Sequence, residues 1–261
     1  MSDIDQTLDW LGKEVACAGC PHESMNAAGR CRLAHACVRD RYARRIDRFF
    51  DWNPDLANSY LHHPHFEVRA IAATRADLFL LPALLDDPDE TVRWNAARRL
   101  PKRYTLRLRR DPHREVRIRI AAELDESEIL PMIGDPDYYV RLVVARRLAP
   151  GRLARMIEDE EPEIRRVVAR RAPIEWLFQM AADREGDVRL EVAKRLAPDL
   201  LPRLRHDPDW RVRFEVATRI AAPHLIGLLA DDDLLVREMA RSRLSVVPEP
   251  QSPEPQKESA P

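Results

Sequence analysis

All four cysteines of the chain lie in one short segment near its N-terminus, and they are the residues best suited to chemistry. They are Cys17, Cys20, Cys31 and Cys37, spaced as C-x2-C-x10-C-x5-C. This clustering indicates a single site. The first ten residues, MSDIDQTLDW, lack the apolar stretch of a secretory signal, so metal ligation is favoured over disulfide bonds.

Two metal centres take four thiolates, namely a tetrahedral zinc ion and a [4Fe–4S] cluster. A C-x2-C pair places two thiolates on one centre through a tight turn, and Pro21 stiffens the exit from that turn. Structural zinc sites usually pair two close cysteine knuckles, whereas Cys31 and Cys37 are farther apart. The spacing leaves both metals open, with paired disulfides as a third possibility. His22 and His35 could replace a thiolate, but four cysteines suffice.

Five arginines follow the last cysteine closely: Arg39, Arg41, Arg44, Arg45 and Arg48. Some of them could neutralise the thiolates and tune the potential of a cluster. The alternative, which we favour for each arginine, is the solvated face of an amphipathic helix. The inward face of that helix would carry Val38, Tyr42, Ile46 and Phe49 or Phe50.

The rest of the chain repeats itself every 24 residues without an insertion. An arginine follows each residue of one apolar column, an alanine usually stands five positions after that column, and a leucine, isoleucine or alanine stands eight after it. These positions share one side of an α-helix. The apolar column consists of Val68, Val92, Val116, Val140, Ile164, Val188, Val212 and Val236.

Each repeat predicts one helix of about ten residues and a shorter second element. An aspartate, usually followed by proline, precedes the helix and suits its N-terminus, and a proline after the helix ends it in several repeats. The remaining segment carries apolar residues three apart, such as Leu81 and Leu84, which fits a 3₁₀ turn or one short α turn. No single unit buries its apolar stripe, so the repeats must stack into an all-α solenoid.

The pattern V-R-x-x-x-A-x-R-L, repeated over residues 55–244, resembles the leucine-rich repeat variant family. That resemblance implies a right-handed superhelix of alternating α and 3₁₀ helices without strands. The cysteine segment is similar to the iron–sulfur domain that accompanies such repeats. All four cysteines match its ligand positions, which implies a [4Fe–4S] cluster, with zinc as the alternative. We therefore expect an iron–sulfur module at 1–52, eight repeats at 53–244 and a disordered tail rich in proline and glutamate at 245–261.

Two columns of arginine recur with the repeat. The arginine after the valine lies beside the apolar stripe, so we expect a partly buried charge paired with the aspartate six residues earlier. A second column could form an exposed basic strip that tracks phosphates, although no aromatic column accompanies it to stack bases. That column is Arg75, Arg99, Arg147, Arg171, Arg195, Arg219 and Arg243, with neighbours Arg98, Arg146, Arg170 and Lys194.

The function predicted from the sequence is a non-enzymatic, cytoplasmic interaction scaffold. There is no glycine-rich phosphate loop, no G-x-S-x-G and no H-E-x-x-H motif. The longest apolar runs have a few residues, such as Leu78–Leu81, so no membrane association is expected. We expect a protein partner on the repeats and a redox-responsive or electron-transferring cluster. The alternative is a nucleic-acid-binding solenoid with a structural cluster, which the net charge of -1 disfavours.

Overall fold

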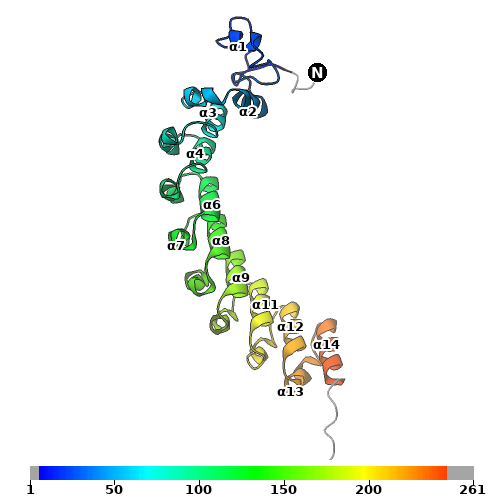
Figure 1. The fold of residues 1–261 in the computed structure, drawn as a ribbon. Helices are drawn as coiled ribbons and strands as arrows, with labels where there is room; N and C mark the ends of the chain where they lie inside the picture. The colour runs from blue at the N-terminus through cyan, green and yellow to red at the C-terminus, as the bar shows by residue number, and fades with distance from the viewer. Residues whose placement is uncertain (1–5, 246–261) are drawn as a thin grey trace, which may run out of the picture. The chain divides into compact units, whose positions relative to one another are not determined.

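The computed structural model describes residues 6–245, which form helices joined by short turns, with no β-strand in this range (Figure 1). Two isolated antiparallel bridges occur in the cysteine module, between Leu8 and Glu14 and between Arg32 and Ala36. The predicted tail lies outside the described residues apart from Ser245, the last residue of a helix. No helix of the described part is long and apolar enough to cross a membrane.

The chain divides into two units, Met1–Met132 and Ile133–Pro261, and each is described by itself. The first unit contains the cysteine module and the first repeats. In its repeats, α-helices alternate with segments of 3₁₀ helix or short α-helix. The helices of this unit are α1 (Glu23–Ala27), α2 (Ala43–Trp52), η2 (Pro54–Tyr60), α3 (Phe66–Ala73), η3 (Leu78–Asp86), α4 (Glu90–Ala97), α5 (Lys102–Thr105), η4 (Leu106–Arg110), α6 (Arg114–Glu123), α7 (Glu126–Ile129) and η5 (Leu130–Met132).

The second unit continues the same alternation. Some second segments are 3₁₀ throughout and others combine a 3₁₀ turn with one α turn, as the three-residue spacing predicts. Its helices are α8 (Tyr138–Arg147), η6 (Pro150–Met156), α9 (Pro162–Arg171), η7 (Ile174–Trp176), α10 (Leu177–Met180), α11 (Gly186–Arg195), η8 (Leu201–Leu204), α12 (Trp210–Arg219), α13 (Ala222–Leu225), η9 (Ile226–Leu228) and α14 (Leu234–Ser245).

The periodic apolar columns form the core of both units. Every residue of the valine column is at most 1% exposed, and the alanines five positions later, from Ala73 to Ala217, are buried with them. Leu81, Leu153, Leu177, Leu201 and Leu225 of the shorter segments are fully buried as well. Burying one such side chain stabilises the fold by about 1.5–3 kcal/mol. The predicted all-α stack of repeats, with alternating α and 3₁₀ helices, is confirmed.

The arginine after the valine is buried or half-buried, as predicted, but its carboxylate partner was predicted wrongly. Arg93 donates from Nε and Nη2 to Asp111 of the next repeat, at 2.7 and 2.6 Å, and from Nη1 to the backbone carbonyl of Asp87 at 2.8 Å. The residue six positions earlier therefore accepts through its main chain, because the planar guanidinium offers two donor edges in different directions. The carboxylate pairs that link successive repeats are Arg69–Asp87, Arg93–Asp111, Arg141–Asp159, Arg165–Asp183, Arg189–Asp207 and Arg213–Asp231.

The second arginine column does not form the exposed strip considered above, since only Arg147 of that column is exposed. Arg195 donates to the carbonyls of Ala169 and Ala172 at 2.6 and 2.7 Å, which lie at the C-terminal end of the preceding helix α9. Those carbonyls lack partners inside their own helix and carry the negative end of its dipole, so a cation is favoured there. Arginines with two such carbonyl bonds are Arg99, Arg171, Arg195, Arg219 and Arg243.

The neighbours of that column, Arg98, Arg146, Arg170 and Lys194, are exposed as predicted. Three of them have carboxylates close by, so the surface carries mixed charge. Arg170 binds Glu191 at 2.9 Å, Lys194 lies 3.7 Å from the same carboxylate, and Arg146 lies 3.9 Å from Glu163. The physical basis for a phosphate-tracking strip is therefore weak.

Candidate metal centre

Cys17 and Cys20 are held by a tight turn that leads into helix α1. The backbone N–H of Cys20 donates to the carbonyl of Cys17 at 3.1 Å, and the N–H of Glu23 donates to the carbonyl of Cys20 at 3.0 Å. Gly19 has a φ of 71°, which an L side chain rarely adopts. The turn therefore depends on glycine, and it places the C-x2-C cysteines on the same side as the second pair.

Cys31 and Cys37 flank a loop that folds back on itself. Arg32 and Ala36 exchange two backbone hydrogen bonds, of 2.9 and 2.8 Å, around Ala34, which has a φ of 58°. This closure brings the two cysteines toward the same pocket although five residues separate them.

Two asparagines anchor this loop to the helices of the module. Asn26 of α1 donates to the carbonyl of Cys31 at 2.9 Å. Asn53, fully buried after α2, donates to the carbonyls of Arg30 and Phe49 at 2.8 and 2.9 Å. Sequence reasoning missed both asparagines. The available signal for Asn53 was its place in the Trp52-Asn53-Pro54 junction, where a helix must end before proline.

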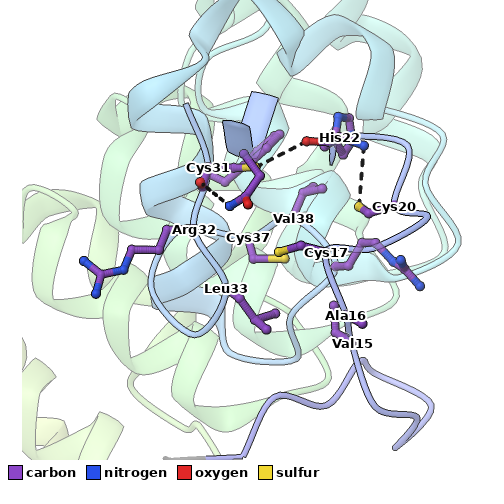
Figure 2. Close-up of a pocket in the computed structure, with 13 residues that line it drawn as sticks. Val15, Ala16, Cys17, Cys20, His22, Cys31, Arg32, Leu33, Cys37 and Val38 are labelled. Carbon is purple, nitrogen blue, oxygen red and sulfur yellow. Dashed lines mark hydrogen bonds between the residues drawn. The ribbon is translucent and has the colours of Figure 1, made fainter. Parts of the chain in front are cut away.

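All four cysteines line one pocket (Figure 2). None of the four forms a disulfide. Apolar side chains enclose the pocket, among them Val15, Val38 and Phe49, all almost completely buried. His22, Arg32 and Arg39 also belong to the lining. The pocket therefore brings together four sulfur donors in a mostly apolar surround.

Two of the four sulfurs, those of Cys31 and Cys37, are disfavoured as thiolates in this surround. Burial raises the pKa of Cys37 to about 11. Burial also raises the pKa of Cys31, and the neighbouring Cys17 and Cys20 add to that shift. A positively charged metal centre would remove this repulsion and hold the four thiolates ionised, with release of protons on binding. The electrostatics of the pocket thus suit a cation.

Hydrogen bonds already reach the sulfur atoms. The backbone N–H of His22 lies 3.5 Å from Cys20 Sγ, in position to donate, and Cys31 Sγ lies 3.7 Å from the carbonyl of His22. The ring of His22 is hydrogen-bonded through Nε2 to the hydroxyl of Tyr60 and packs against Phe49. His35 packs on Trp52 and lies outside the pocket lining. Neither ring is placed as a replacement for a cysteine sulfur.

The arginines after Cys37 have different roles, so the prediction of one solvated face was wrong for Arg45. Arg45 is 8% exposed and donates to Asp40 at 2.8 Å and to the carbonyl of Gln6 at 3.1 Å. Asp40 is completely buried, and a buried carboxylate needs a charged partner. Arg44 is exposed, as predicted, and Arg39 is half-buried at the pocket.

The module packs directly on the first repeat, as expected from the absence of a flexible linker. Arg75 of the first repeat binds Asp47 of α2 at 2.8 Å and also pairs with Asp51. The ring of Trp10 stacks on His65 at 5.5 Å, with an angle of 7° between the two ring planes. Burial raises the pKa of Tyr60, which packs between module and repeat, to about 12. The domain boundary between 52 and 53 remains a prediction.

The donor set fits both metals considered. Thiolates are soft ligands that select zinc and iron–sulfur centres. Within residues 6–245, no three His, Cys, Asp or Glu side chains are grouped as ligands of a single metal ion. The four cysteines instead line one pocket together.

Known proteins resemble this chain over both the module and the repeats. Residues 7–59 match a family model described as "LRV protein FeS4 cluster". An uncharacterized 27.7 kDa protein in the nifB 3' region of Rhodobacter capsulatus is 46% identical over 101 residues, which cover 39% of this chain and 41% of that relative. The chain thus spans about two fifths of the length of this curated relative.

A solved structure matches almost from end to end. It is described as "a leucine-rich repeat variant with a novel repetitive protein structural motif", and it is 41% identical to this chain with a TM-score of 0.79. The match covers 88% of this chain and 99% of that chain. The repeat pattern, the alternating α and 3₁₀ helices and this match agree, and the chain belongs to the leucine-rich repeat variant family.

Proposed function

We propose that this protein is an iron–sulfur interaction scaffold. Cys17, Cys20, Cys31 and Cys37 would hold one [4Fe–4S] cluster, and the repeats would bind a protein partner. When bound, such a cluster supplies one-electron redox chemistry. The observation that carries the proposal is the convergence of all four cysteines on one apolar pocket.

Three features support a cluster over zinc. Within the described residues, no three His, Cys, Asp or Glu side chains are grouped around a single metal ion, and the walls of the pocket are mostly apolar, which limits the access of water to the sulfurs. The backbone N–H of His22 lies near Cys20 Sγ, and hydrogen bonds to sulfur are among the factors that set a cluster's potential. The family model that matches residues 7–59 carries an FeS4 cluster in its description.

The scaffold role rests on the repeats. Stacked repeats expose extended surfaces while each unit contacts only its neighbours, an arrangement suited to binding another macromolecule. Their periodic arginines act mainly within the fold, since one column links repeats and the other caps helices. This removes the principal support for the nucleic-acid alternative. We also expect no enzymatic activity, because no catalytic motif accompanies the four cysteines.

Serine substitution of the cysteines tests the assignment of ligands. Each of Cys17→Ser, Cys20→Ser, Cys31→Ser and Cys37→Ser should lower the iron content and the charge-transfer absorption of anaerobically purified protein, because serine is a harder and less acidic ligand. Ala18→Ser, at an exposed position of the same turn, is the matched control and should keep both. Full iron content in any cysteine variant would remove that cysteine from the ligand set.

A further inference from the structure

One surface of the cysteine module carries arginines, a histidine and a tryptophan. We call it the basic face, formed by Arg32, His35, Arg44, Arg48 and Trp52. Arg44, Arg48 and Trp52 stand four residues apart along α2, so they share one side of that helix. Arg32 and Arg44 are exposed, and Trp52 is 42% exposed although it is a large apolar residue.

The loop between Cys31 and Cys37 and the helix α2 form this face together. Arg48 Nη1 lies 3.3 Å from Nδ1 of His35, and the rings of His35 and Trp52 are 5.6 Å apart. Arg32 lines the cysteine pocket, and its guanidinium points away from the labelled sulfur atoms (Figure 2). A partner on this face would therefore touch the segment that joins two of the predicted ligands.

Acidic side chains next to the basic face share one arginine of the first repeat, which offsets part of their charge. The two acidic residues of α2, Asp47 and Asp51, both bind Arg75 of the first repeat. Within the described part of the chain, by contrast, Arg32, Arg44 and Arg48 have no carboxylate partner. The face thus keeps three positive charges at a place where the fold does not use them in ion pairs.

The chemistry of this face fits an acidic protein. Arginine and tryptophan are enriched among the residues that dominate protein–protein binding. Complementary charge speeds encounter and orients the partner, and weak redox complexes have small interfaces. A single-stranded nucleic acid would require successive aromatic side chains for base stacking, whereas the basic face exposes one tryptophan.

We infer that the basic face is the docking surface for an acidic electron-carrier protein, such as a plant-type [2Fe–2S] ferredoxin. The inference rests on the proposed function, because a cluster in the adjacent pocket gives such a carrier a reason to bind here. Binding should be weak and transient, with a dissociation constant in the micromolar range, on the order of 10 μM at low salt.

The test is calorimetric titration of the cluster-loaded protein with an acidic plant-type ferredoxin. The double variant Arg44→Glu/Arg48→Glu should weaken binding at least about tenfold in about 50 mM salt, and the difference should shrink in about 0.5 M salt. Glutamate at position 44 lies in the first turn of α2, where the helix dipole favours an anion, so folding should be retained. Arg110→Glu/Arg155→Glu, at exposed positions of the repeats, is the matched control.

Iron and sulfide content, measured on each sample, separates failure of docking from failure of the cluster assignment. Salt-sensitive ferredoxin binding that is lost in Arg44→Glu/Arg48→Glu and kept in the control supports the inference. No binding by the loaded wild-type protein, or equal binding by the two double variants, overturns it. Tighter binding of a single-stranded oligonucleotide through Arg44 and Arg48 would overturn it in favour of nucleic acid.

Discussion

In each arginine–aspartate pair between successive repeats, the arginine uses both edges of its guanidinium group. One edge binds the aspartate of the next repeat, and the other binds a backbone carbonyl of its own repeat. Arg165 is 4% exposed and donates to both oxygens of Asp183, at 2.7 and 3.0 Å. It also donates to the carbonyl of Asp159 at 2.8 Å, in the loop before its own helix. Bidentate, charge-assisted bonds of this kind are the strong ones, and breaking them leaves a nearly buried carboxylate without its cation.

Arg165→Ala should therefore lower the free energy of unfolding by about 2 kcal/mol or more. Urea denaturation with circular dichroism detection measures the change. Arg155→Ala, which removes an exposed arginine of the same unit, is the control and should cost less than about 0.5 kcal/mol. An equally small loss for Arg165→Ala would show that the arginine–aspartate pairs contribute no net stability.

The same pairs predict how stability depends on pH. Hydrogen bonds from Arg213 lower the pKa of Asp231 below its ordinary value of 3.8, against the opposing effect of burial. Burial acts to raise the pKa of Asp183, but the hydrogen bonds from Arg165 and from the N–H of Glu185 outweigh it, so that the pKa of Asp183 is lowered. Because the folded state favours the ionised carboxylates, their contribution is present above about pH 4 and is lost as the pH falls through the lowered values.

Between about pH 5 and pH 3, the wild-type protein should thus lose more stability than an Arg165→Gln variant, in which the pKa of Asp183 returns toward normal. Urea midpoints measured across this range give the comparison. Parallel curves for the two proteins would mean that Arg165 does not lower the pKa of Asp183.

At the scale of elements, the second arginine column acts as a C-terminal cap supplied by the following repeat. Arg195 of α11 reaches the last turn of α9, where two carbonyls have no partner within the helix. Its neighbour Lys194 is exposed and lies 3.7 Å from Glu191 on the surface of its own helix. Of these two adjacent cations, Arg195 therefore caps the preceding helix, whereas Lys194 lies on the surface of its own helix.

Arg195→Ala should destabilise the protein by about 1–2 kcal/mol, because two carbonyls lose a charged donor, and Arg195→Lys should recover only part of this loss. Lys194→Ala is the matched control, with an expected change under about 0.5 kcal/mol. The urea midpoints of the three variants and of the wild-type protein measure these changes in stability. Equal effects of Arg195→Ala and Lys194→Ala would contradict the capping role.

The helices of the repeats could be predicted because their core consists of valine, alanine and leucine side chains in fixed columns. Helix α2 lies outside those columns, but the helical spacing of its apolar residues predicted the inward face, and Ile46, Phe49 and Phe50 are buried. The pairing of Arg93 with Asp111 could not be predicted, because residues 18 apart in sequence become neighbours only when the repeats stack. Periodicity reveals which residues are equivalent, whereas their partners depend on how far one repeat is displaced from the next.

At the scale of the whole molecule, the order of the parts could be predicted from the sequence. The four cysteines mark a module near the N-terminus, and the 24-residue period marks the repeats that follow it. The convergence of Cys17, Cys20, Cys31 and Cys37 on one pocket agrees with the prediction of a single site. The anchors of that pocket, Asn26 and Asn53, could not be found, because asparagine has many roles and no repeat marks it. The periodic columns do not identify a partner, since their residues form the core and the contacts between repeats.

The metal content of the purified protein tests the iron–sulfur assignment most directly. Protein purified under anaerobic conditions from cells supplied with iron and sulfide should be brown and contain about four iron and about four sulfide per chain, with little zinc. Inductively coupled plasma mass spectrometry and a sulfide assay give these values for one sample. About one zinc per chain, without sulfide and without charge-transfer absorption, would contradict the iron–sulfur assignment and the function built on it.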